Sequence, residues 1–207
     1  MISIKNEYND RLEEANKLLE HIESISGVVE TSILKSSYTL LLYNNLEATV
    51  SSVISHVHDI ASECNYSELS EELRHLYANY YHFDIKKSSV KSNIDLTISG
   101  DSTFPVFSEY CKKVTVFSGN IDFRSLNKIL TSYGIAKIVI WSQNSDNILT
   151  IKNKRNKLAH GEESFKDCCR DHTVSELKEL GKSLERLLNK LIENVEKYVS
   201  EENYKIS

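Results

Sequence analysis

Residues 173–200 have the sequence TVSELKELGKSLERLLNKLIENVEKYVS, a strongly periodic pattern. Its apolar side chains recur at spacings of three and four residues, which places them on one face of an α-helix. These side chains are Leu177, Leu180, Leu184, Leu187, Leu191, Val195 and Tyr198. Thr173 and Glu176 form a T-x-x-E capping box, a signature of a helix N-terminus. The stretch therefore predicts a long helix that buries one apolar face.

Helices with few breaks are predicted for most of the remaining chain. Only six glycines and one proline occur among 207 residues, too few for the turns of a β-sandwich or a glycine-rich α/β protein. Apolar periodicity and capping residues predict further helices over residues 8–22, 32–64, 67–83, 122–133 and 147–160. Asp122 is expected to cap the fourth of these, and Ser145 or Asp146 the fifth. We therefore expect a mainly all-α fold.

Residues 84–120 differ from the rest of the chain in composition. Serine, asparagine and threonine cluster there, and Ile94–Ile98 and Val114–Phe117 alternate as short strands do. We expect a small loop or β-hairpin insertion at 84–120, within a single domain that covers residues 1–207. The apolar run at 138–141 fits a strand or a helical turn equally well.

Charge and cysteine content limit the classes of function. A net charge of −5 argues against a protein that coats nucleic acid through a basic face, although it leaves room for a local basic patch. The N-terminus lacks a signal-peptide core, and no stretch has the roughly 18 apolar residues of a membrane span. Because the four cysteines form no CxxC pair, reduced thiols are expected and no metal site. These observations predict a soluble cytoplasmic protein with no membrane contact and no cofactor.

The segment KNKRNKLAHG at residues 152–161 carries the strongest chemical signal. Four of its first six residues are basic, in a chain that is acidic overall. Arg155 is permanently cationic, and His160, five residues later, belongs to the residue type that titrates near neutral pH. On a regular helix, five residues correspond to a rise of about 7.5 Å and a rotation of about 140°. The two side chains would then flank a cleft, at the end of a helix that stops at Gly161.

Cleavage of RNA by its own 2′-hydroxyl is a reaction that uses such a pair. A histidine can act as general base or acid, and an arginine can bind phosphoryl oxygens and stabilise the charged transition state. Asn156 could orient the histidine or the phosphate. The structural alternative is that the basic residues complement the C-terminal end of the helix dipole and that His160 caps the helix.

The motif RNKLAHG resembles the R-x4-6-H signature of the HEPN superfamily, in which a polar residue typically follows the arginine, as Asn156 does. The stretches ILKSSYTLLLYNNLEATV, VFSGNIDFRSLNKILTSYGI, IKNKRNKLAHGEESF and DHTVSELKEL are similar to those of bacterial HEPN-like nucleases found with defence genes. The resemblance extends from about Leu34 to Tyr198. It implies an HEPN-like helical bundle, a dimer with a shared cleft and metal-independent endoribonuclease activity.

By the same resemblance, Arg155 and His160 match the catalytic positions and Asn156 the supporting polar position. Lys152, Lys154 and Lys157 are then expected to attract RNA, either transfer RNA or messenger RNA, in a toxin or phage-defence effector. Glu47 is expected either to line the cleft or to face solvent. Glu162 stands where some HEPN toxins carry a tyrosine that a partner enzyme modifies, so restraint by a separate antitoxin or defence-system protein is expected instead. The alternative from another class is a helical module that binds RNA, nucleotide or protein without cleaving it.

Overall fold

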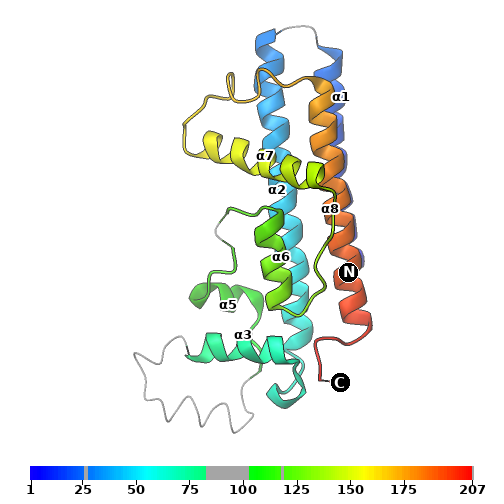
Figure 1. The fold of residues 1–207 in the computed structure, drawn as a ribbon, viewed down its shortest axis with the longest axis vertical. Helices are drawn as coiled ribbons and strands as arrows, with labels where there is room; N and C mark the ends of the chain where they lie inside the picture. The colour runs from blue at the N-terminus through cyan, green and yellow to red at the C-terminus, as the bar shows by residue number, and fades with distance from the viewer. Residues whose placement is uncertain (26–27, 83–102, 118, 207) are drawn as a thin grey trace. The chain divides into compact units, whose positions relative to one another are not determined.

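The computed structural model describes residues 1–25, 28–82, 103–117 and 119–206. These residues form seven α-helices and one 3₁₀ turn, and no sheet, which confirms the all-α fold class (Figure 1). The elements are α1 (Ile2–Ser24), α2 (Val28–Ala61), η1 (Tyr66–Glu68), α3 (Glu71–His82), α5 (Phe107–Lys113), α6 (Phe123–Ser132), α7 (Ser142–Ala159) and α8 (Val174–Ser200).

The chain forms two compact units, each assembled from separate stretches of sequence. Unit 1 contains Met1–Val50, Gly119–Ser125 and Ile138–Ile192; unit 2 contains Ser51–Ser118, Leu126–Lys137 and Glu193–Ser207. The helices α2 and α8 each contribute one part to each unit. The expectation of a single domain over residues 1–207 stays a prediction.

Unit 1 is a bundle in which α1, the first part of α2 and the first part of α8 pack together, while α7 lies across α2 (Figure 1). Polar contacts tie the helices at fixed positions. Arg11 of α1 donates to the Asn45 Oδ1 of α2 at 3.2 Å, and Asn147 of α7 donates to the Ser183 hydroxyl of α8 at 2.8 Å. The buried apolar side chains of this unit include Tyr8, Ile22, Leu42, Leu46, Ile148, Ile151, Leu184, Leu187 and Leu191.

Unit 2 is organised around His58, which is fully buried on α2. One ring nitrogen of His58 lies 2.7 Å from the Pro105 carbonyl and the other lies 2.7 Å from the Tyr133 hydroxyl. Burial lowers the pKa of His58 to about 4, so the ring is neutral at pH 7. Four aromatic rings pack within 4.9–5.5 Å of the imidazole centroid: Phe104, Phe107, Tyr110 and Tyr133.

The predicted helices agree with the structure most closely where a cap was recognised. Asp122 caps α6 through its bond from the Ser125 backbone N–H at 2.8 Å. Thr173 and Glu176 exchange the two bonds of the capping box at the start of α8, at 2.7 and 3.2 Å. Local side-chain chemistry is sufficient to define these helix ends.

The prediction was wrong at the start of α7, which begins at Ser142 with Trp141 as its N-cap instead of Ser145 or Asp146. The physical reason is tertiary, because Asn144 is buried and its Oδ1 accepts hydrogen bonds from Ser183 and Arg186 of α8. The residues before it, 138–141, form neither a strand nor a helical turn.

The insertion predicted at 84–120 is described only from residue 103 onward. Ile94–Ile98, the first expected strand, lies outside the described residues. Val114–Phe117, its expected partner, is not a strand, and the residues before it form the helix α5, which the sequence did not predict. The run FSEYCKK has only one buried side chain, Tyr110, and is too short to show an apolar period.

Candidate active site

The end of α7 places the three predicted catalytic residues. Arg155 and Asn156 lie in its last turns, and His160 is the first residue after Ala159. The His160 N–H donates to the Asn156 carbonyl at 2.9 Å, and Gly161 then takes a left-handed conformation with φ +69°. This conformation ends the helix, as expected for a glycine at this position. The His160 side chain is exposed, so it is free to meet a ligand from solvent.

The Arg155 guanidinium is held by two residues of α2 and by its own neighbour. Nη2 lies 3.8 Å from the Glu47 Oε2, and Cζ lies 4.9 Å from the ring centroid of Tyr43. Nη1 donates to the Asn156 Oδ1 at 3.1 Å. Tyr43 and Glu47 are four residues apart on α2, so their side chains share one helix face. Glu47 therefore contacts Arg155 instead of facing solvent alone.

The turn at residues 119–121 also lies against the guanidinium, close to both Arg155 and Glu47. Asn120 Oδ1 accepts from the Asn156 Nδ2 at 2.6 Å, and the Ile121 N–H donates to the Tyr43 hydroxyl at 2.9 Å. Gly119 has φ +65°, and a Cβ built on it would lie 3.3 Å from the Arg155 Nη2. The absence of a side chain at Gly119 thus lets the turn approach Arg155 closely.

Sequence analysis missed Tyr43, Gly119 and Asn120 as site residues. Tyr43 had a detectable signal, because it stands one helical turn before Glu47. Burial raises the pKa of Tyr43 to about 12, so its hydroxyl is protonated at neutral pH. Its aromatic ring makes the cation–π contact with Arg155. Nothing local in the sequence pairs Asn120 with Asn156, 36 residues later.

A family model described as HEPN_MAE_28990-like HEPN matches residues 2–204 of the chain. The chain belongs to this HEPN family. No curated protein and no solved structure matches it. HEPN membership supports a nuclease or RNA-related role, since HEPN domains often act as ribonucleases and dimerise.

The three lysines of the HEPN motif segment are engaged with acceptors of the same unit. Lys152 donates to the Asp122 Oδ2 at 2.8 Å, where both side chains are about four-fifths buried. Burial alone would raise the pKa of Asp122, but the hydrogen bonds from Lys152 and Ser125 outweigh it and lower the pKa. Lys152 therefore links α7 to the N-terminus of α6 and is not a free cation.

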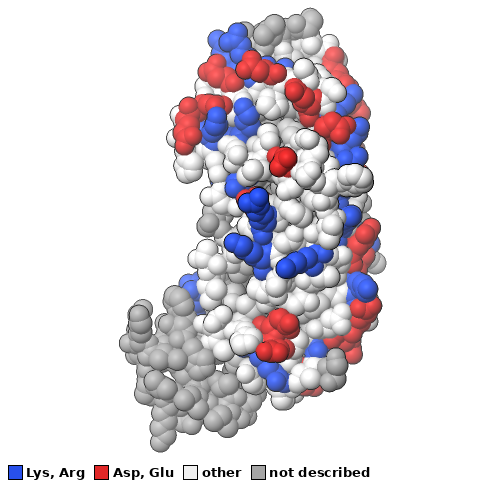
Figure 2. All heavy atoms as spheres, in the orientation of Figure 1, with Lys and Arg blue, Asp and Glu red and all other residues white. Residues whose placement is uncertain are grey.

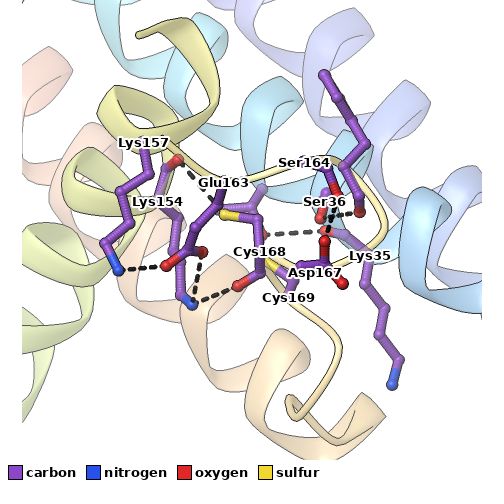
Figure 3. Close-up of polar contacts among 11 residues, drawn as sticks. Lys35, Ser36, Lys154, Lys157, Glu163, Ser164, Asp167, Cys168 and Cys169 are labelled. Atoms are coloured by element: carbon purple, nitrogen blue, oxygen red, sulfur yellow. Dashed lines mark hydrogen bonds and ion pairs between the residues drawn. The ribbon is translucent and has the colours of Figure 1, made fainter. Parts of the chain in front are cut away.

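Lys154 and Lys157 both turn toward Glu163, just after the HEPN motif (Figure 3). Lys157 donates to the Glu163 Oε1 and lowers the pKa of that carboxyl, while Lys154 lies 3.9 Å from its other oxygen. Lys154 also donates to the Cys168 carbonyl, and the Cys168 thiol donates back to the Lys154 carbonyl at 3.6 Å. Of the three lysines, Lys157 has the most exposed side chain, at 43%.

Residues 161–173, here called the strap, are also anchored to α2. Ser36 donates to the Phe165 carbonyl at 2.7 Å, and Lys35 donates to the His172 carbonyl at 2.6 Å. The Thr39 hydroxyl lies 3.5 Å from the buried Cys169 sulfur. These contacts anchor the chain that leaves His160 to α2.

The site therefore brings Arg155, Asn156 and Glu47 into direct contact and leaves His160 exposed at the adjoining helix end. Chemically, it offers a guanidinium held in the last turns of α7 and an exposed imidazole five residues later, at the end of the helix. Among the residues that the structure describes, no three His, Cys, Asp or Glu side chains are grouped to hold a metal ion. In that part of the chain, no helix combines the length and apolar character that crossing a bilayer requires.

Proposed function

We propose that this HEPN chain is a metal-independent endoribonuclease that cleaves RNA through the adjacent 2′-hydroxyl. The observation that carries the proposal is the fixed Arg155 guanidinium, which lies against Glu47, Tyr43 and Asn156 at the end of the helix capped by His160. A cation that is positioned before substrate arrives can stabilise charge in a transition state without reorganising.

The proposed reaction conserves atoms and charge as follows. His160 removes the proton of the 2′-hydroxyl, and the 2′-oxygen attacks the neighbouring phosphorus. The bond from phosphorus to the 5′-oxygen breaks, and that oxygen receives a proton from a general acid. The products are a 2′,3′-cyclic phosphate and a 5′-hydroxyl. Arg155 stabilises the charge on the phosphoryl oxygens, while Asn156 holds the guanidinium in orientation.

The proposal includes a homodimer. One chain brings one histidine to the motif, whereas the reaction needs a base for the 2′-hydroxyl and an acid for the 5′-oxygen. A second copy facing the first across the cleft would supply the other group. Because His160 is exposed at a helix end, it is accessible for such a shared arrangement.

The lysines enter the proposal as a source of positive potential. Lys152, Lys154 and Lys157 are paired in the free protein, so any direct contact with phosphate would replace an existing ion pair. Lys157, as the most exposed, is the first candidate for such an exchange. Transfer RNA or messenger RNA is the proposed substrate, in a toxin or phage-defence effector restrained by a separate protein.

The test is incubation of the purified chain with end-labelled RNA in EDTA, followed by analysis of the product ends. Arg155→Lys and His160→Ala are each expected to lower cleavage at least a hundredfold, since each removes a group made for the transition state. His75→Ala is the matched control, because His75 is an exposed histidine on α3 that lies 3.7 Å from Glu71.

Cleavage that survives both site substitutions, or that requires a divalent ion, would contradict the proposal. RNA binding without cleavage by the wild-type chain would instead support a non-catalytic RNA-binding module. A mass measurement by light scattering tests the dimer, and a monomer that cleaves at full rate would rule out the shared site.

A further inference from the structure

Trp141, the single tryptophan of the chain, is the most exposed large apolar side chain among the described residues. Its relative exposure is 84%, and it stands at the N-cap of α7. A tryptophan in such a position loses the stabilisation that burial would give, which points to a binding surface. The proposed mechanism leaves this side chain without a role.

The backbone that carries Trp141 is fixed on both sides. Before it, the Lys190 ammonium donates to the Val139 carbonyl at 2.7 Å, and the Ile138 side chain is buried. After it, the Trp141 carbonyl accepts hydrogen bonds from the Asn144 and Ser145 N–H groups in the first turn of α7. The indole is therefore presented to solvent from an ordered position, as a stacking platform requires.

Trp141 and the proposed catalytic residues belong to the same helix. Fourteen residues separate Trp141 from Arg155, which corresponds to about 21 Å along the axis. At spacings of three and four residues, one stripe of the helix leads from Trp141 toward His160. It consists of Ser145, Leu149, Asn153 and Asn156, all exposed or partly exposed.

The surroundings of Trp141 favour a nucleic acid over a protein partner. Hydroxyl and amide side chains dominate the stripe, in which Leu149 is the apolar member, and Val139, two residues before Trp141, is also exposed. The helix carries four basic residues, Lys152, Lys154, Arg155 and Lys157, against one carboxylate, Asp146. In Figure 2 the surface over the N-terminal half of α7 is mostly uncharged. These basic residues lie eleven or more positions after Trp141 and are already paired with carboxylates, so the contribution proposed for Trp141 is base stacking on its exposed ring.

We propose that Trp141 stacks on a base of a single-stranded RNA segment that runs along α7 from the phosphate cleaved at Arg155 and His160. This inference rests on the proposed function and adds a substrate subsite to it. At the spacing of about 3.4 Å per stacked nucleotide, 21 Å corresponds to about six nucleotides. An extended strand spans the distance with fewer. The subsite would therefore select single-stranded substrates and set a minimum length on one side of the cut.

The sole tryptophan makes the subsite directly measurable. The His160→Ala chain is titrated with a twelve-nucleotide single-stranded RNA, and Trp141 emission is recorded alongside the anisotropy of a dye on the RNA. Stacking is expected to quench the emission in step with binding. Trp141→Ala is expected to weaken RNA affinity about tenfold to a hundredfold, and Trp141→Phe to restore most of it. Ile33→Ala, at another exposed apolar residue, is the matched control.

Three results would overturn the subsite. The first is RNA binding that leaves the emission of Trp141 unchanged, together with an RNA affinity that Trp141→Ala does not change. The second is Trp141 emission that depends on protein concentration, together with a lower mass in Trp141→Ala, which would identify a contact between copies of the chain. The third is a KM for cleavage that is unchanged in Trp141→Ala. If RNA quenches Trp141 but the wild-type chain does not cleave it, the nuclease proposal fails and the subsite stands. If cleavage proceeds at the same KM in Trp141→Ala, the subsite fails and the nuclease proposal stands.

Discussion

Arg155 and Glu47 lie 3.8 Å apart between α7 and α2, and each side chain is about three-quarters buried. The ring of Tyr43 and the amide of Asn156 complete the enclosure of the guanidinium. A partly buried ion pair of this kind orients the Arg155 side chain as much as it stabilises the fold. In the proposed mechanism Glu47 is accordingly a positioning residue, which acts on the phosphate only through Arg155.

Substitution Glu47→Gln tests that role. The amide keeps the size of the side chain but removes the charge that attracts Arg155, so the guanidinium is expected to lose its fixed orientation. We expect kcat to fall about ten- to a hundredfold with a small change in KM, since modest misplacement of a catalytic group has effects of this size. Steady-state kinetics on a fluorogenic RNA measures both constants. Glu14→Gln, an exposed carboxylate on α1, is the control. Equal kcat in Glu47→Gln and the wild type would contradict a positioning role for Glu47.

Substitution Gly119→Ala tests the close approach of the 119–121 turn. A side chain at φ +65° costs about 1–2 kcal/mol of stability, and its Cβ would lie 3.3 Å from the Arg155 Nη2. We expect both a lower unfolding free energy and a loss of cleavage. Gly134→Ala has the same strain, with φ +74°, but its Cβ would meet Glu72. It should lose similar stability in urea unfolding and keep its activity; equal activity in both variants would contradict the close approach.

The strap can be tested through Cys168, one of its two cysteines. Burial raises the pKa of the Cys168 thiol to about 12, so it should resist alkylation at pH 8 while the exposed Cys111 reacts. Glu163→Ala removes the carboxylate that both Lys154 and Lys157 contact. We expect alkylation of Cys168 to become faster in this variant, as measured by mass spectrometry with Cys111 as the internal reference. An unchanged Cys168 rate would show that Glu163 does not hold the strap in place.

The stability of the chain should fall in mild acid because of His58. The folded-state pKa of His58 is about 4, below its ordinary value near 6.5, so below pH 6.5 the unfolded chain binds a proton that the folded chain excludes. The contribution of His58 to the free energy of unfolding is therefore fully present above pH 6.5 and is lost progressively as the pH falls toward 4. The loss between pH 7 and pH 5 is about 2 kcal/mol. Urea unfolding of the wild type and of His58→Gln at both pH values checks this.

The wild type and His58→Gln are compared by the change in unfolding free energy between pH 7 and pH 5. Their absolute stabilities are not compared, because His58→Gln also loses aromatic packing. The variant should lack the 2 kcal/mol difference, to within about 0.5 kcal/mol. The exposed His75→Ala should retain it. A full pH difference in His58→Gln would mean that other groups cause the acid sensitivity.

Local chemistry explains which parts of this molecule could be predicted. The leucine period of α8, the Asp122 cap and the stop at Gly161 depend on residues within one or two turns of each other. Sequence alone shows such relationships because helix geometry fixes them. Arg155, Asn156 and His160 were predicted as site residues from a local motif and its resemblance to the HEPN signature, and their catalytic roles stay a prediction.

The partners of those residues depended on packing that the sequence does not display. Asn120 meets Asn156 across 36 residues, and Asn144 extends α7 because α8 supplies its hydrogen-bond donors. The lysines looked like free cations, yet each has an acceptor elsewhere in its unit. Most contacts of the site therefore join segments that are distant in sequence, whereas the apolar periodicity predicted the helices that carry them.

The most direct test of the central claim is cleavage of an RNA that carries a single 2′-deoxynucleotide. The cleaved bond is first mapped on the unmodified RNA, and the deoxy sugar is then placed on its 5′ side. If the 2′-hydroxyl is the nucleophile, cleavage at this bond disappears in EDTA while other sites are cut as before, and the unmodified product ends in a 2′,3′-cyclic phosphate. Cleavage at the deoxy position at the normal rate would contradict attack by the 2′-hydroxyl, and with it the roles assigned to Arg155 and His160.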